Sequence, residues 1–105
     1  MYARVTTVPV KPGKLDETVS IIQESVKPVM EKQAGYRGAL LLTNPDKTSV
    51  TSITLWETVA DLTGSQFDAA YQERIAQLSE LVAGPPTTET YEVRSQELYG
   101  GYQDL

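Results

Sequence analysis

The chain of 105 residues contains no cysteine and no histidine. Without cysteine there is no disulfide, no thiolate nucleophile and no thiolate metal ligand. Without histidine the chain lacks the commonest general base, the commonest ligand for zinc and haem, and any Ser-His or Cys-His catalytic pair. These two absences exclude most of the standard routes of hydrolytic and metal-dependent catalysis.

Other absences narrow the class of protein further. The nine basic residues are scattered and outnumbered by fourteen acidic ones, giving a net charge of -5, so we expect neither a nucleic-acid nor a membrane partner. No apolar run approaches the ~20 residues that span a bilayer, and residues 1–7 lack the apolar run of a signal peptide, so a cytoplasmic location is expected. No Asp-rich or phosphate-binding glycine loop is present, and we expect no metal or cofactor.

Apolar periodicity predicts six elements within one domain over residues 1–96. Strands are expected over residues 2–8, 36–43, 49–57 and 88–95. A first helix should follow residue 14, kink or restart at Pro28 and end at Gly35. A second helical region should break at Gly64 and continue from residue 65 to about residue 82. This order predicts an α+β, ferredoxin-like βαββαβ fold, with both helices on one face of a four-stranded antiparallel sheet.

The other face of this sheet should be apolar as well. Residues 40–42 are three successive leucines, so both faces of that strand are apolar, and Ile53 and Leu55 alternate with Trp56 on the next strand. Because monomers seldom expose a patch of this kind, we expect a homodimer held through the sheet faces. A wider helix layer over a single buried face is the alternative.

The last residues, 97–105, are expected to form a C-terminal tail. Gly100 and Gly101 disfavour a regular element, whereas Tyr99, Tyr102 and Leu105 are too apolar for a free tail. We expect the tail to lie across the partner subunit or over a pocket.

Three segments carry a resemblance to a known family. They are Lys11-Pro12-Gly13 before the first helix, Gly35-Tyr36-Arg37-Gly38 at the start of the second strand, and Thr54-Leu55-Trp56-Glu57-Thr58 at the end of the third. In this order and spacing the chain resembles the antibiotic biosynthesis monooxygenase family over residues 2–95. The resemblance implies a dimeric α/β barrel with a pocket between each sheet and its own helices. Haem-degrading members use a histidine on the second helix, so that branch is set aside.

The resemblance also implies that Trp56 lines the pocket. The period of two in a strand places Ser52 and Thr54 on the same face as Trp56, where short polar side chains would leave room for a planar ligand. The candidate substrate-binding residues are Trp56, Thr54, Ser52, Thr6, Tyr71 and Phe67, with Arg4 at the pocket edge. Aromatic walls with a few polar groups are typical of small-molecule pockets, but core packing explains the aromatic residues equally well.

Two functions are compatible with these residues. The resemblance implies a cofactor-independent monooxygenase of a small aromatic, polyketide-like compound, since an electron-rich phenol or hydroquinone can itself supply electrons to oxygen. The alternative is a non-catalytic, ligand-binding or stress-associated dimeric barrel, and a third is an isomerase or decarboxylase. Monooxygenases of the family often carry an asparagine where Ser52 stands, which weighs against the first function. No catalytic residue is assigned.

Overall fold

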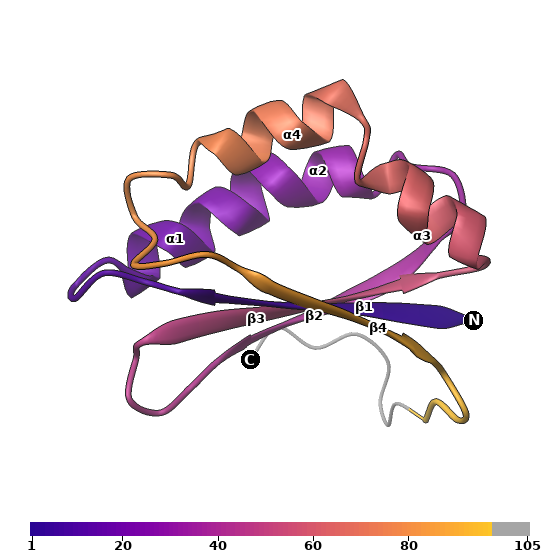
Figure 1. Ribbon diagram of the computed structural model, residues 1–105, viewed down its shortest axis with the longest axis horizontal. Coiled ribbons are helices and arrows are strands. Elements are labelled where there is room, and N and C mark those ends of the chain that lie inside the picture. The colour runs from indigo at the N-terminus through magenta and orange to yellow at the C-terminus, as the bar shows by residue number, and fades with distance from the viewer. Residues whose placement is uncertain (98–105) are drawn as a thin grey trace.

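A computed structural model describes residues 1–97 of the chain. The elements are β1 (Tyr2–Pro9), α1 (Leu15–Ile21), the π-helix η1 (Ile22–Val26), α2 (Lys27–Met30), β2 (Tyr36–Thr43), β3 (Ser49–Trp56), α3 (Val59–Ser65), α4 (Ala69–Ala76) and β4 (Thr87–Glu92). The sheet order is β2-β3-β1-β4, with every neighbouring pair antiparallel. The helices form one layer above this sheet (Figure 1). The predicted α+β, ferredoxin-like fold is confirmed.

The first helical region consists of three consecutive segments, and a new α-helical segment, α2, begins at Lys27. Pro28 lies in the first turn of α2, directly after the π-helix η1. Because proline has no backbone N–H, it cannot donate the hydrogen bond that an unbroken α-helix requires. The predicted restart at Pro28 is therefore confirmed, and the wider π turn before it accommodates the missing donor.

The second helical region differs from the prediction. The expected break at Gly64 is wrong, because α3 continues through Gly64 to Ser65, and the expected long helix ends already at Ala76. The side chain of Asp68 accepts a hydrogen bond from the backbone N–H of Tyr71 at 2.9 Å, so the new helix begins after Asp68. The Ser65 hydroxyl donates to the Leu62 carbonyl instead of capping a helix.

The C-terminal part of the chain is described only to residue 97. β4 ends at Glu92, three residues earlier than expected. The backbone N–H of Val93 then donates to the carbonyl of Met1 at 2.9 Å. The expected contacts of Tyr99, Tyr102 and Leu105 lie outside the described residues.

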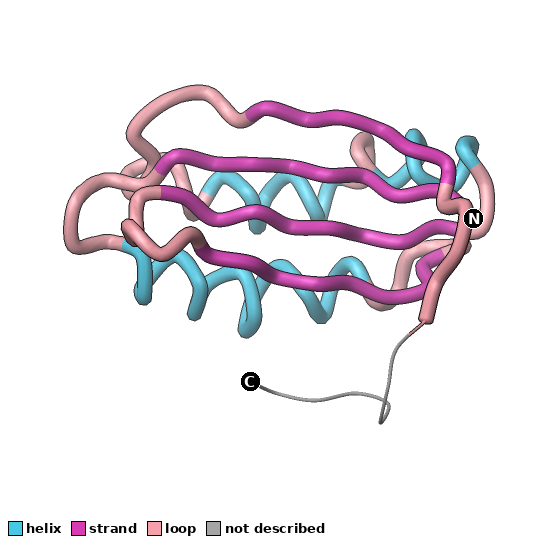
Figure 2. The backbone as a smooth tube through the Cα atoms, turned by 90° about the horizontal axis from the view of Figure 1, so that it is seen from below, coloured by secondary structure: helices cyan, strands magenta, loops and turns pink. Residues whose placement is uncertain are grey.

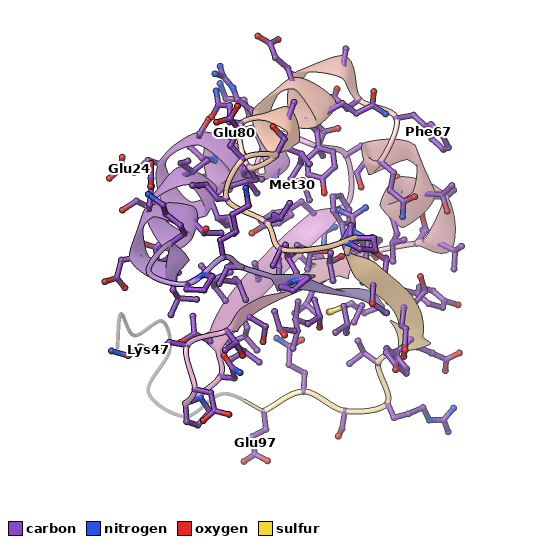
Figure 3. The ribbon with its side chains drawn as sticks, turned by 60° about the vertical axis from the view of Figure 1, so that its left-hand side comes forward. Glu24, Met30, Lys47, Phe67, Glu80 and Glu97 are labelled. Carbon is purple, nitrogen blue, oxygen red and sulfur yellow. The ribbon has the colours of Figure 1, made fainter. Side chains whose placement is uncertain are left out.

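The core between helices and sheet consists of two separate clusters. One contains Trp56, Leu62, Val26 and Met30, and Met30 lies between the helices and the sheet in Figure 3. The other cluster contains Val10, Leu15 and Val50. Because these two clusters are separate, the side chains between the helices and the sheet do not form one continuous core.

The second face of the sheet is not covered by any helix of the described part of the chain. It is turned to the viewer in Figure 2, with the helices behind it. Leu40 on β2 is 47% exposed and lies opposite Ile53 on β3, while Leu42 and Tyr91 are also exposed. An apolar surface of this kind is unusual for a monomer. No helix within residues 1–97 is long and apolar enough to cross a membrane.

Candidate functional site

The floor of the candidate site is formed by strands β1 and β3. Strand register places Arg4 opposite Thr54 and Thr6 opposite Ser52, and strand periodicity turns all four side chains toward the helices. On the other side of β1, the Thr6 hydroxyl lies 3.4 Å from the hydroxyl of Thr88 on β4. The floor is therefore polar, although the side chains that the helices contribute to the cavity, such as Val26, Met30 and Ile75, are apolar.

A cavity of about 70 Å³ lies on this floor, between the two core clusters. It is lined by Arg4, Thr6, Val8, Ile22, Val26, Met30, Val50, Ser52, Thr54, Tyr71, Ile75 and Leu78. A wider cleft of about 490 Å³ beneath α4 shares six of these residues, namely Arg4, Thr6, Val8, Tyr71, Ile75 and Leu78. The two spaces are neighbours on these shared residues, and we call them together the α4 cleft; the larger of the two has the size of a pocket for a small organic molecule.

Arg4 is the central polar group of the α4 cleft. Its side chain is only 3% exposed, and its Nη1 donates hydrogen bonds to the Leu62 carbonyl at 3.3 Å and to Ser65 Oγ at 2.9 Å. The guanidinium carbon lies 5.5 Å from the ring centres of both Trp56 and Tyr71. These two contacts are cation–π interactions, which hold the guanidinium in place.

The charge of Arg4 has no acidic partner among residues 1–97. None of the four ion pairs in that range involves Arg4. Burial lowers the pKa of the Arg4 guanidinium from its usual range, an effect that nearby Tyr71 partly opposes. An arginine nevertheless stays protonated in proteins, so the cleft contains a buried, uncompensated positive charge.

Trp56 lies beside this site and not in its wall. The indole is completely buried, and its N–H donates to Thr54 Oγ1 at 2.9 Å. Its ring meets that of Tyr36 edge-on, with centres 5.6 Å apart. Trp56 therefore packs beside Arg4 and Thr54 on the helix-facing side of the sheet, and it is absent from the residues that line the cavity.

The structure brings together most of the residues expected at the site. Thr6, Ser52, Thr54 and Tyr71 all line the cavity. Phe67 does not, since it lies in the turn between α3 and α4, is 72% exposed and points away from the molecule in Figure 3. The expected long helix would have turned Phe67 inward, and the break at residues 66–68 removes it from that helix.

Sequence reasoning underestimated Arg4 and missed the apolar roof. Arg4 was expected at the pocket edge but lies at its centre, among side chains of β1 that alternate toward the helices. Ile22, Val26 and Met30 reach the cavity from the first helical region, where their helical spacing indicates only burial. The sequence does indicate the unusual position of Arg4, because strand periodicity places this charged residue on the face of β1 that is turned to the helices.

The ionisable groups of the site are few. Within residues 1–97, no cluster of three or more Asp or Glu side chains is placed to hold a metal ion. The lining residues include one cation, Arg4, and no carboxylate. Among the described residues, the α4 cleft is therefore lined by no side chain that is an ordinary general base near neutral pH.

Comparison with known proteins identifies the family. The sequence model of the antibiotic biosynthesis monooxygenase domain matches residues 1–77, so the chain belongs to this family. No curated protein sequence matches the chain.

Solved structures show the same fold at low sequence identity. A putative antibiotic biosynthesis monooxygenase from Bordetella bronchiseptica superimposes with a TM-score of 0.79 at 20% identity, covering 88% of this chain and 95% of that one. SnoaB from Streptomyces nogalater, described as a cofactor-independent oxygenase, gives 0.77 at 17% identity, with 90% and 94% covered. A Nitrosomonas europaea protein of unknown function gives 0.78 at 17% identity, with 95% of each chain covered.

Proposed function

We propose that this protein is a cofactor-independent monooxygenase that oxidises a small, electron-rich aromatic compound in the α4 cleft. The observation that carries the proposal is the apolar cleft with one buried cation, Arg4, in a chain of the antibiotic biosynthesis monooxygenase family. The likeness to SnoaB adds support at the level of the fold.

The proposed reaction needs no electron donor besides the substrate. A phenol with a free para C–H loses its hydroxyl proton, and the phenolate passes electrons to O₂. A C–O bond forms at the para carbon, and loss of water then breaks the O–O bond and leaves a carbonyl. The balance is phenol plus O₂ giving para-quinone plus H₂O, so one oxygen atom enters the product and the other leaves as water.

The residues of the cleft supply position and a dry environment for this reaction. Val8, Ile75 and Leu78 exclude water from an aromatic ring, and Arg4 orients an oxygen atom that carries negative charge. Because no carboxylate lines the cleft, the hydroxyl proton must leave to solvent. Turnover should therefore rise with pH toward the pKa of the substrate, which for an unactivated phenol is about 10.

We also propose that the protein works as a homodimer joined through the uncovered sheet face. Leu40, Leu42 and Tyr91 are exposed there in the single chain, and burial of a contiguous apolar surface favours association. In this arrangement the α4 cleft stays on the opposite face of each sheet, so each subunit keeps its own site.

The test is oxygen consumption by the purified protein with a panel of 1-naphthols and other phenols that have a free para C–H, without flavin, haem or added metal and with a chelator present. We expect uptake that is saturable in the phenol. Ser52→Ile, which adds volume inside the cavity, should abolish uptake, whereas Thr43→Ile adds the same kind of group at an exposed position of β2 and should not.

The panel also separates this proposal from a binding role. Saturable quenching of the single tryptophan without oxygen uptake would contradict the monooxygenase and support a non-catalytic ligand-binding protein. Neither quenching nor uptake with any compound would contradict both.

A further inference from the structure

The hydrogen bonds of Arg4 are all made by one of its three nitrogens. Nη1 donates to Leu62 and Ser65, whereas Nε and Nη2 donate to none of the described residues. Within residues 1–97 no sealed side-chain nitrogen or oxygen lacks a partner, so Nε and Nη2 must meet open space. Because Arg4 is 3% exposed and lines the cavity, that space is the α4 cleft.

The two unused nitrogens form a defined recognition edge. Nε–H and one N–H of Nη2 lie parallel in the guanidinium plane, and this pair matches the two oxygens of a carboxylate. The bonds from Nη1, together with the rings of Trp56 and Tyr71, fix the orientation of that plane. The edge is therefore held in position before any ligand arrives, which reduces the entropy lost on binding.

The surroundings of Arg4 select the kind of anion. Among residues 1–97 it is the only cation that lines the cleft, so the second negative charge of a phosphate ester would have no partner there. A buried arginine without a counter-ion is costly, and a single carboxylate would compensate it. The remaining lining, including Val8, Ile75 and Leu78, is apolar and suits a hydrocarbon ring.

We propose that Nε and Nη2 of Arg4 form a carboxylate subsite and that the cleft takes a planar aromatic acid. If this acid is also the compound that is oxidised, which rests on the proposed function, the substrate class is a phenolic carboxylic acid. The carboxylate sits against Arg4, and the phenol ring extends beneath α4. Binding of the acid does not depend on whether it is oxidised.

The test compares 5-hydroxy-2-naphthoate with its neutral carboxamide, 5-hydroxy-2-naphthamide, by anaerobic titration calorimetry at pH 7. A hydrogen-bonded charge pair predicts that the acid binds about 10- to 100-fold more tightly than the amide. Arg4→Met should remove this preference, and Arg4→Lys, which keeps the charge but loses the parallel donors, should retain only part of it. Arg37→Met is the matched control, since Arg37 is an exposed arginine on β2 that pairs with Glu57, and should leave the preference unchanged.

Equal affinity for acid and amide in the wild type, or a preference that survives Arg4→Met, would overturn the subsite. If Arg4→Met does not fold, Arg4→Lys decides, because undiminished acid affinity in that variant would also overturn the proposal. Acid binding without oxygen uptake would contradict the proposed oxygenase and leave the subsite intact. Oxygen uptake with equal affinity for acid and amide would support the proposed oxygenase and contradict the carboxylate subsite.

Discussion

The buried hydrogen bond between Trp56 and Thr54 gives a direct measure of how the floor of the cleft is held. Thr54→Val keeps the shape of the side chain but removes the acceptor that the described residues offer to the indole N–H of the completely buried Trp56. Leaving a buried donor without a partner costs about 1–3 kcal/mol. In a chain of this size each kcal/mol lowers the Tm by roughly 4–8 °C.

The assay is a double-mutant cycle in urea, followed by far-ultraviolet circular dichroism at one fixed protein concentration. Trp56→Phe removes the indole N–H, so adding Thr54→Val to that variant should cost almost nothing. The coupling energy between the two positions should therefore be about 1–3 kcal/mol, and the volume lost with the indole cancels in the cycle. If Thr54→Val lowers the free energy of unfolding equally in the wild type and in Trp56→Phe, the assigned hydrogen bond is refuted.

Three further predictions follow from other parts of the molecule. Leu40→Glu places a charge on the uncovered sheet face and should halve the mass measured by light scattering. Val59→Glu, at an exposed position of α3, should leave the mass unchanged. A Leu40→Glu variant that is still a dimer would contradict the sheet-face interface. Asp68→Ala removes the side-chain cap of α4 and should lower the free energy of unfolding by about 0.5–2 kcal/mol. Asp46→Ala in the hairpin turn is the control and should have little effect. Equal losses of stability in the two variants would show that the cap contributes nothing. Burial, assisted by the neighbouring carboxylate of Glu31, raises the pKa of Tyr36. The stability that this shift contributes is complete below the unfolded pKa of about 10 and is lost as the pH rises through the folded pKa. In Tyr36→Phe the free energy of unfolding should therefore fall less steeply with pH above about 10, and an unchanged slope would contradict the raised pKa.

The sequence predicts the strands and their order well because each signal is local. β-branched residues indicate β1, apolar residues that alternate between two faces indicate β3, and Pro28 lies in the first turn of a new helical segment. The break after α3 was misplaced because Ser65 has the spacing of a cap, although its hydroxyl bonds back to Leu62 within the helix. Which of two cap-like residues is used depends on tertiary packing, which local patterns do not contain.

The site was predictable in part for the same reason. Ser52, Thr54 and Thr6 follow from strand periodicity alone. The central position of Arg4 depends on partners 58 and 61 residues away in the chain. Its uncompensated charge depends in addition on the absence of a carboxylate from every lining element, which only the assembled structure shows.

The central claim, that the α4 cleft carries out cofactor-independent monooxygenation, is tested most directly by isotope labelling. The purified protein is incubated with 5-hydroxy-2-naphthoate or 1-naphthol under ¹⁸O₂, with a chelator and without added cofactor, and the product is analysed by mass spectrometry. The proposal predicts a para-quinone that contains one ¹⁸O atom per molecule, together with labelled water, and no product from the cavity-filled Ser52→Ile variant. Absence of labelled product, or equal labelling by Ser52→Ile, would contradict it.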